Sequence, residues 1–277
     1  MIMIHHIYRP KFPDTYSRDR PRTTTNPSPV LLNWNGGAFV FNAHGADEPF
    51  CKHIANEAGY TVLDASCALA PEHPFPSGLE DAEDLLLYVL QHPDVYDAKK
   101  IVLSGFSSGA NLALAAAANL NRQSKIPRTS IRAVVVFYPP TSMVIHPAGK
   151  RMLDGTLPHV PPLLRFLMGT FRAAYLPPGV DPSDPRVSVL EADPEHFPDD
   201  LIVITAEKDR LAPEAETLAT KLQSAGKNVL LKRFDGVRHG WDKTKDDESN
   251  NAKVRDEAYG LVVSYLSGLD KTEPLSG

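Results

Sequence analysis

Cysteine is scarce in this chain, and long apolar runs are missing. Only Cys51 and Cys67 occur among 277 residues, so one disulfide is the most that could form, and the low count suits a reducing compartment. No segment reaches the roughly 18 to 20 unbroken apolar residues that a membrane-spanning helix needs. The first residues show no positive region followed by an apolar core, so we expect neither a signal peptide nor an anchor. These features favour a soluble, cytoplasmic protein.

Basic runs are also missing. The formal net charge is −5 at pH 7, and no cluster of lysine and arginine suggests nucleic acid or an anionic membrane as a partner. Composition is that of an ordinary globular protein, with 42% hydrophobic and 23% charged residues. We therefore expect no nucleic-acid partner, and a homodimer stays open.

Short apolar runs that could be buried strands alternate with helical patterns. The strand candidates are Val30-Leu31-Leu32, Phe39-Val40-Phe41 and the stretches 60–63, 101–103, 133–137, 201–204 and 229–231. The helical patterns cover 50–58, 79–90, 110–121, 213–225 and 251–266. Such alternation predicts an α/β fold, with a mostly parallel central sheet flanked by helices on both faces.

The chain is long enough to bury a substantial core, and we interpret residues 1–277 as one domain. The stretch 139–198 breaks the alternation because it is rich in proline and has no clear strand, so it is predicted to be a lid or cap insertion above the sheet. Residues 1–29 are interpreted as an N-terminal extension that leads into the first strand.

A candidate nucleophile lies at a strand-to-helix boundary. Gly105-Phe106-Ser107-Ser108-Gly109 matches G-x-S-x-G in one register only, with Ser107 in the middle. The glycines are needed because a Cβ in so tight a turn would collide with neighbouring backbone. A flexible polar loop would also be rich in serine and glycine. The pentapeptide alone therefore does not show whether Ser107 is a nucleophile, and the residues that could activate it must be identified.

A serine hydroxyl needs a base to remove its proton and an acid to orient that base. Asp209 and His239 each follow a strand candidate, in the chain order Ser, Asp, His. Both therefore belong at the carboxyl edge of the sheet, where open α/β sheets place their sites. Glu207 is an alternative acid, but Asp209 lies deeper in the loop and is preferred. His239 could instead be an ordinary loop histidine.

The transition state of acyl transfer also needs backbone N–H donors. Gly36 and Gly37 follow the first central strand, and the N–H of Ser108 comes directly after the nucleophile, so these three are the predicted oxyanion hole. Alternatively, Gly36 and Gly37 could simply form a hairpin turn.

An apolar helix is expected near the serine. The run from Leu163 to Tyr175 has apolar residues at helical spacing, so one face could line an acyl pocket or could simply pack on the sheet. The predicted pocket residues are Phe39, Phe106, Phe166, Phe171 and Trp241.

Several segments together resemble the hormone-sensitive-lipase-like branch of the α/β-hydrolases. They are Asn35-Gly36-Gly37-Ala38-Phe39, Leu69-Ala70-Pro71-Glu72-His73-Pro74-Phe75-Pro76, the Ser107 pentapeptide with Ala110-Asn111-Leu112-Ala113, and the segments around Asp209 and His239. The proline-containing segment is the most specific to this branch. The similarity covers roughly residues 30–266.

The chain departs from that family at three places. The family usually has His where Asn35 stands, an acidic residue where Phe106 stands, and Tyr-Arg where Cys67-Ala68 stand. Asn35 can still hold the loop by hydrogen bonds, although the change could weaken the oxyanion hole.

The resemblance implies a carboxylesterase-type serine hydrolase that needs no cofactor and no metal. Its expected substrate is a small or medium carboxylic ester or lactone. Amide or formamide hydrolysis and acyl transfer would use the same residues. A non-catalytic binding protein for small molecules is the alternative from another class.

Overall fold

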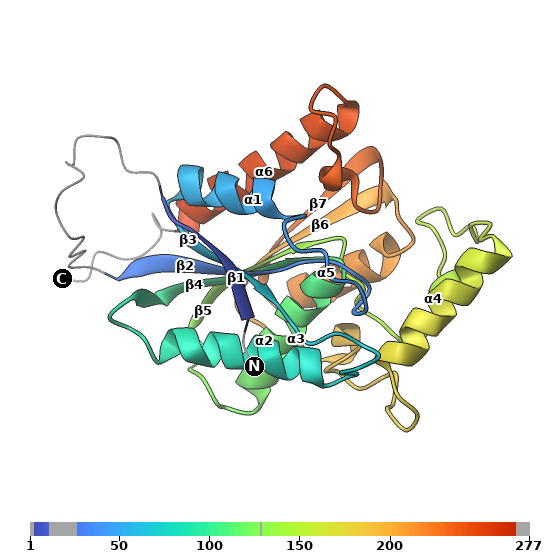
Figure 1. Ribbon diagram of the computed structural model, residues 1–277, viewed down its shortest axis with the longest axis horizontal. Helices are drawn as coiled ribbons and strands as arrows, with labels where there is room; N and C mark the ends of the chain where they lie inside the picture. Colours follow the sequence, from blue (N-terminus) through green and yellow to red (C-terminus); the bar gives the residue numbers. More distant parts are fainter. Residues whose placement is uncertain (1–2, 11–26, 128, 270–277) are drawn as a thin grey trace.

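A computed structural model describes residues 3–10, 27–127 and 129–269 of the chain. Seven strands form one sheet in the order β1-β3-β2-β4-β5-β6-β7, as Figure 1 shows. All neighbours pair in parallel except β1 and β3, which are antiparallel. The strands are β1 (Met3–Tyr8), β2 (Ser28–Trp34), β3 (Thr61–Ser66), β4 (Tyr96–Phe106), β5 (Ile131–Phe137), β6 (Asp200–Lys208) and β7 (Asn228–Arg238).

The predicted mostly parallel sheet is confirmed, and two details of the strand prediction are wrong. The expected N-terminal extension contains β1 and the first residues of β2, because Met3–Tyr8 pairs with the outer side of β3 as an edge strand. The run Phe39-Val40-Phe41 is no strand. Ala38 and Phe39 have φ angles of 53° and 64°, which turn the chain back, and the amides of Val40 and Phe41 both donate to the carbonyl of Gly37.

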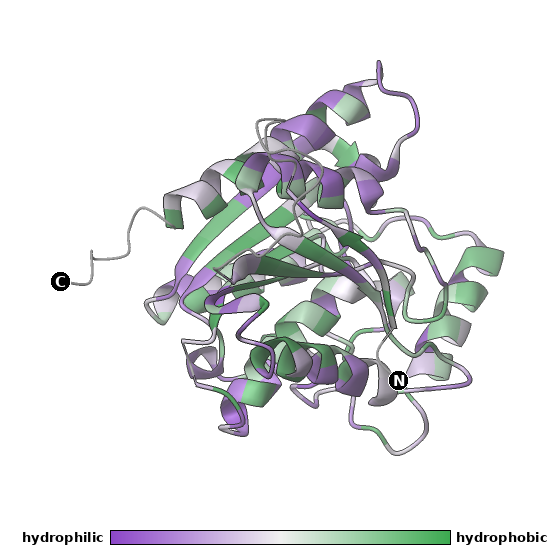
Figure 2. Cartoon of the chain, turned by 60° about the vertical axis from the view of Figure 1, so that its left-hand side comes forward, coloured by the Kyte–Doolittle hydropathy of each residue, from purple (hydrophilic) through white to green (hydrophobic). Residues whose placement is uncertain are grey.

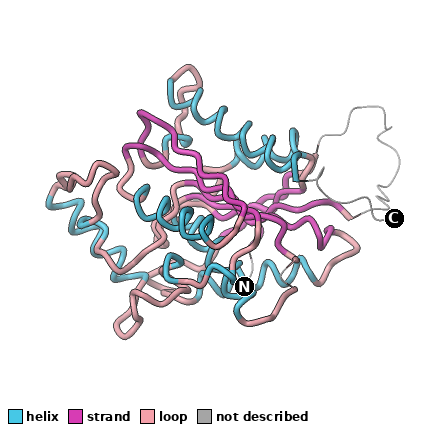
Figure 3. Tube along the Cα trace, turned by 180° about the vertical axis from the view of Figure 1, so that it is seen from behind, coloured by secondary structure: helices cyan, strands magenta, loops and turns pink. Residues whose placement is uncertain are grey.

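Helices cover both faces of the sheet (Figures 1 and 3). The core on one face contains side chains from α2 (Ser77–Leu90), α3 (Ser108–Arg122) and α5 (Ala212–Ser224). The core on the other face contains α1 (Glu48–His53), its π-helical continuation η1 (Ile54–Ala58) and α6 (Asn250–Leu269). Central strands are buried on both sides, which explains why Val30, Leu31 and Leu32 form an unbroken apolar run. Figure 2 shows this pattern, with hydrophobic colours on the central strands and both colours on the surrounding helices.

The stretch 139–198 contains α4 (Pro162–Tyr175) and three 3-10 turns, η2 (Pro147–Gly149), η3 (Val189–Glu191) and η4 (Pro194–His196). In Figure 1, α4 lies at the right-hand side of the molecule, away from the layers that cover the sheet. Throughout the described residues, no helix is both long and apolar enough to cross a membrane.

Candidate active site

Ser107 occupies a strained turn between β4 and α3. Its φ and ψ are 51° and −118°, a combination that costs energy for a residue with a Cβ. The turn is possible only because Gly105 and Gly109 flank it: a Cβ at Gly109 would lie 2.0 Å from the carbonyl oxygen of Trp34, and one at Gly105 would lie 2.4 Å from the backbone of Gly109. The serine therefore stands at the carboxyl edge of the sheet, at the N-terminus of α3.

The structure brings Ser107, His239 and Asp209 together. His239 Nε2 lies 2.9 Å from Ser107 Oγ, and His239 Nδ1 lies 2.7 Å from Asp209 Oδ2. The side chain of Asp209 is only 3% exposed, whereas that of His239 is 40% exposed. The carboxylate is thus fixed inside the protein, and the imidazole is open to a substrate.

The alternative acid is directed elsewhere. Glu207 is exposed at the end of β6, and its carboxylate accepts a hydrogen bond of 2.7 Å from the amide of Gly236 in β7. Asp209 instead accepts from the amide of Leu211 through Oδ1, which leaves Oδ2 for the imidazole. The geometry therefore favours Asp209 as the partner of His239.

The glycine pair lies beside the serine. A Cβ at Gly36 would be 3.3 Å from the Cβ of Ser107 and 3.1 Å from the carbonyl oxygen of Phe106, so the loop approaches the serine closely. Gly37 has a φ of 153°, and a Cβ there would be 2.1 Å from the carbonyl oxygen of Phe41. Asn35 donates from Nδ2 to the carbonyl of Gly36 at 2.6 Å. The loop is thus tied by its own side chain, in the way expected for Asn35.

A tyrosine that sequence reasoning missed supports the histidine. The ring of Tyr138 lies 4.6 Å from the His239 ring between centroids, and its hydroxyl donates to Asp242 at 2.5 Å. Burial, followed by the nearby Asp242 carboxylate, raises the pKa of Tyr138 well above its usual value, so the phenol stays protonated. Its position after β5, at the same sheet edge as Ser107 and Asp209, was the available signal.

Phe106, which stands where the related family usually has an acidic residue, packs against a buried lysine. Phe106 is fully buried, and the Nζ of Lys243 lies 3.3 Å from its ring centroid. Lys243 also pairs with Asp47 at 2.5 Å and Asp242 at 2.8 Å. Burial disfavours the ammonium, but these two carboxylates outweigh it and raise the pKa of Lys243. An aromatic face and two carboxylates therefore hold this buried cation.

A cavity of about 320 Å³ opens beside the serine and histidine. Apolar side chains of α4 line one side of it, at the helical spacing of Leu164, Met168, Phe171 and Tyr175. Phe39 lies opposite and stacks on Tyr175 at 3.7 Å between ring centroids. The prediction that one face of this helix turns toward Ser107 thus agrees with the geometry.

The pocket predictions fit for two residues and fail for three. Phe39 and Phe171 line the cavity. Phe106 and Trp241 are buried in the core on the α1 and α6 face, because the side chains of the β4 end and of the turn after His239 point inward there. Phe166 lies on the outer face of α4 and is 69% exposed.

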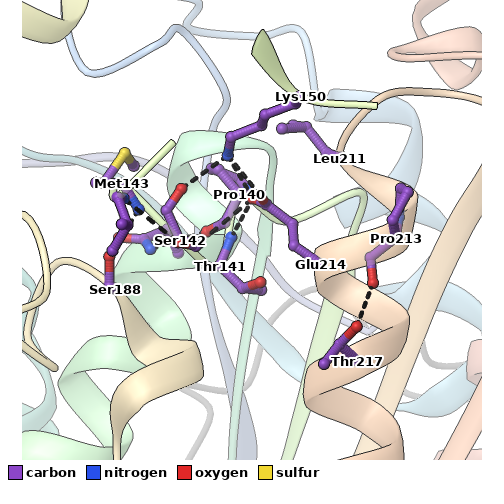
Figure 4. Close-up of polar contacts among 12 residues, drawn as sticks. Pro140, Thr141, Ser142, Met143, Lys150, Ser188, Leu211, Pro213, Glu214 and Thr217 are labelled. Atoms are coloured by element: carbon purple, nitrogen blue, oxygen red, sulfur yellow. Dashed lines mark hydrogen bonds and ion pairs between the residues drawn. The ribbon is translucent and has the colours of Figure 1, made fainter. Parts of the chain in front are cut away.

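A buried ion pair fastens the start of the 139–198 stretch to α5. Lys150 Nζ lies 2.6 Å from each carboxylate oxygen of Glu214 and donates to the carbonyl of Ser142 at 2.7 Å. Figure 4 shows these side chains converging, with the amide of Thr141 also donating to Glu214. Burial lowers the pKa of Lys150 and raises that of Glu214, and the ion pair opposes both shifts.

A second cavity, of about 310 Å³, lies on the other side of Phe39 and Tyr175 and contains His44 and His73. The histidine that bonds Ser107 is His239, which lines the first cavity. Among residues whose placement is described, no group of three or more His, Cys, Asp or Glu side chains could hold a metal ion.

Comparisons with known proteins agree with this geometry. A family model described as the alpha/beta hydrolase fold matches residues 31–243. The carboxylic ester hydrolase LipN of Mycobacterium tuberculosis is 28% identical over 247 residues, covering 87% of this chain and 64% of LipN. Mouse hormone-sensitive lipase is 28% identical over 114 residues, covering 40% of this chain and 15% of that protein. The chain thus spans less than two thirds of either relative.

A solved structure, the hyperthermophilic esterase of the archaeon Pyrobaculum calidifontis, superposes with a TM-score of 0.77. It is 28% identical, and the match covers 91% of this chain and 80% of that one. The parallel sheet, the glycine-flanked serine at its carboxyl edge and these matches lead to one conclusion. The chain belongs to the α/β-hydrolase fold family, in its hormone-sensitive-lipase-like branch.

Proposed function

We propose that the protein hydrolyses a small or medium carboxylic ester through an acyl-enzyme on Ser107. The observation that carries this proposal is the unbroken hydrogen-bonded series from Asp209 through His239 to Ser107, with contacts of 2.7 and 2.9 Å. The relatives named as ester hydrolases support the same reaction.

The hydrogen bonds of the site support the following roles. His239 Nε2 takes the hydroxyl proton as Ser107 Oγ attacks the ester carbonyl, and Asp209 holds the Nδ1–H tautomer and stabilises the imidazolium. The carbonyl oxygen becomes an oxyanion, which the N–H groups of Gly36, Gly37 and Ser108 receive at the N-terminus of α3. His239 then returns the proton to the leaving alcohol. In the second half, His239 deprotonates a water that attacks the acyl-enzyme and regenerates Ser107.

The 139–198 stretch acts in this proposal as the cap over the acyl group. Its helix α4 supplies apolar lining, and two aromatic contacts hold it against the oxyanion loop: Phe39 on Tyr175, and the edge contact of Phe41 with Phe171 at 4.9 Å. A cavity of about 320 Å³ suits a short acyl chain.

The test is the pair Ser107→Ala and Ser108→Ala, assayed with p-nitrophenyl esters of increasing chain length and with a fluorophosphonate probe. Removing the nucleophile should lower kcat by about 10⁶-fold and abolish labelling. Ser108→Ala keeps the backbone N–H and should be far milder. Equal losses in the two variants, or an unlabelled wild-type protein, would contradict the proposed role of Ser107.

A further inference from the structure

The cavity beside Ser107 is apolar in most of its lining but carries an excess of positive charge. Three cationic residues line it, Lys150, Arg172 and Arg210, against the single carboxylate of Asp209. Asp209 Oδ2 bonds His239 and Oδ1 accepts from the amide of Leu211, and no hydrogen bond or ion pair joins this carboxylate to any of the three cations. Whether each of the three cations already has an acceptor must therefore be judged from its other contacts.

Two of the three cations are already occupied. Lys150 donates to Glu214 Oε1 and to the carbonyl of Ser142, and its ammonium is ion-paired with Glu214 Oε2 (Figure 4). Arg172 donates from Nε and Nη2 to the carbonyl of Met143, at 3.3 and 2.8 Å. These contacts fix the backbone of the cavity wall.

Arg210 differs from both. Its Nη1 is shielded from solvent and has no hydrogen-bond partner within the described part of the chain. A guanidinium nitrogen that loses water without gaining an acceptor costs free energy, and the cost is larger for a charged group than for a neutral one. Nη1 itself is closed to solvent, but the Arg210 side chain lines the cavity and is only half buried, so an anionic ligand there would give the guanidinium an acceptor. A planar carboxylate fits a guanidinium fork.

We propose that Arg210 binds a carboxylate on the substrate, so that the enzyme prefers esters that carry a free carboxylate near the scissile bond. This inference rests on the proposed esterase function and names its substrate class. A single unpaired guanidinium in an apolar cavity matches one negative charge, whereas a doubly charged phosphate would be desolvated with too few partners. Hydrolysis of such a substrate would yield either a dicarboxylic acid or a hydroxy acid, according to the side on which the carboxylate sits.

The experiment compares matched ester pairs. On the acyl side, the p-nitrophenyl monoester of glutaric acid is compared with p-nitrophenyl pentanoate. On the alcohol side, the butyrate ester of 4-hydroxybenzoate is compared with that of 4-hydroxybenzamide. We expect kcat/KM to favour the anionic member of one pair by tenfold or more. Glutarate should also inhibit neutral-ester hydrolysis competitively, and its diamide should not.

Variants assign the preference to the side chain. Arg210→Met should lower the ratio of anionic to neutral kcat/KM by about 10- to 100-fold, the scale of a charge-assisted hydrogen bond of 1.5 to 3 kcal/mol. Arg210→Lys should retain part of the preference. Lys208→Met removes an exposed charge two residues away and should leave the ratio unchanged.

Two outcomes would overturn the inference while leaving the esterase proposal intact. In the first, the wild-type enzyme hydrolyses neutral esters but shows no preference in either pair. In the second, Arg210→Met lowers both members of the preferred pair equally, which would make Arg210 a support for the neighbouring Asp209. A wild-type enzyme that hydrolyses neither the neutral nor the anionic member of either pair would instead count against the esterase proposal itself.

Discussion

Individual residues around the cavity bear most of the unusual backbone geometry of the molecule. In the described residues, five non-glycine residues have a positive φ, and four of them lie at the cavity or beside His239: Ala38, Phe39, Ser107 and Tyr138. Such conformations cost about 1 to 3 kcal/mol each and persist only where surrounding packing enforces them. Their clustering here is consistent with a site that is held ready before the substrate arrives.

At the same scale, Asp209→Asn tests the orientation of the base. An amide at this position would favour the wrong imidazole tautomer, so kcat should fall by about 10⁴-fold, the size of the effect in a comparable triad. Glu207→Gln is the matched control, because it changes a nearby carboxylate that bonds only the Gly236 amide in the contacts observed. Steady-state kinetics on one neutral ester measure both. A larger loss in Glu207→Gln than in Asp209→Asn would mean that Glu207, and not Asp209, is the acid that orients His239.

At the scale of elements, α4 presents two apolar faces with different surroundings. Leu164, Met168 and Phe171 line the cavity, whereas Leu163 and Phe166 are exposed on the outside. The helix is attached to the rest of the protein by the contacts of Phe171 with Phe41 and of Tyr175 with Phe39. Its inner face is thus part of the pocket wall.

Phe171→Ala should therefore enlarge the pocket and shift the preference toward longer or bulkier acyl groups. Each additional methylene accommodated is worth about 0.8 kcal/mol of burial, roughly fourfold in kcat/KM. Phe166→Ala removes an equal volume from the exposed face and should leave the chain-length profile as it is. The profile and the unfolding midpoint are measured on both variants. An unchanged profile with a stability loss of about 3 to 5 kcal/mol in Phe171→Ala would mean that this ring is only a core contact.

At the scale of the whole molecule, the charge of Glu83, on the α2, α3 and α5 face of the sheet, opposes folding at neutral pH. Glu83 of α2 is buried against α3, where Asn119 Nδ2 donates to its carboxylate. Burial raises the pKa of Glu83, and the Asn119 contact offsets this only in part. The folded protein thus binds this proton more tightly than the unfolded chain does.

The sign of the pH effect follows from this shift. Below the unfolded-state pKa the group is protonated in both states, and as pH rises through the folded pKa its ionisation costs stability. Glu83→Gln should therefore raise the thermal unfolding midpoint at pH 8 and have less effect at pH 4. Glu80→Gln, at an exposed position of the same helix, controls for the loss of one charge. A gain of equal size at both pH values would refute the desolvation argument.

Much of the fold and of the site could be predicted from local sequence signals. The buried parallel strands appear as unbroken apolar runs, and the helices between them appear as periodic patterns. Gly105 and Gly109 mark the strained turn because no other residue fits it. Ser107, Asp209 and His239 could then be chosen because each follows a predicted strand, in the chain order Ser, Asp, His.

Only the tertiary structure decided which side chains face the cavity. Phe106 and Trp241 are aromatic neighbours of Ser107 and His239 in the sequence, yet both point into the core because backbone direction at a strand end depends on the packing beneath it. Arg210 and Lys150 come from loops far apart in the chain, and no local pattern distinguishes them from surface residues. Apolar periodicity and backbone sterics are local properties and so are readable from sequence, whereas the pairing or isolation of a charge depends on segments that meet only after folding.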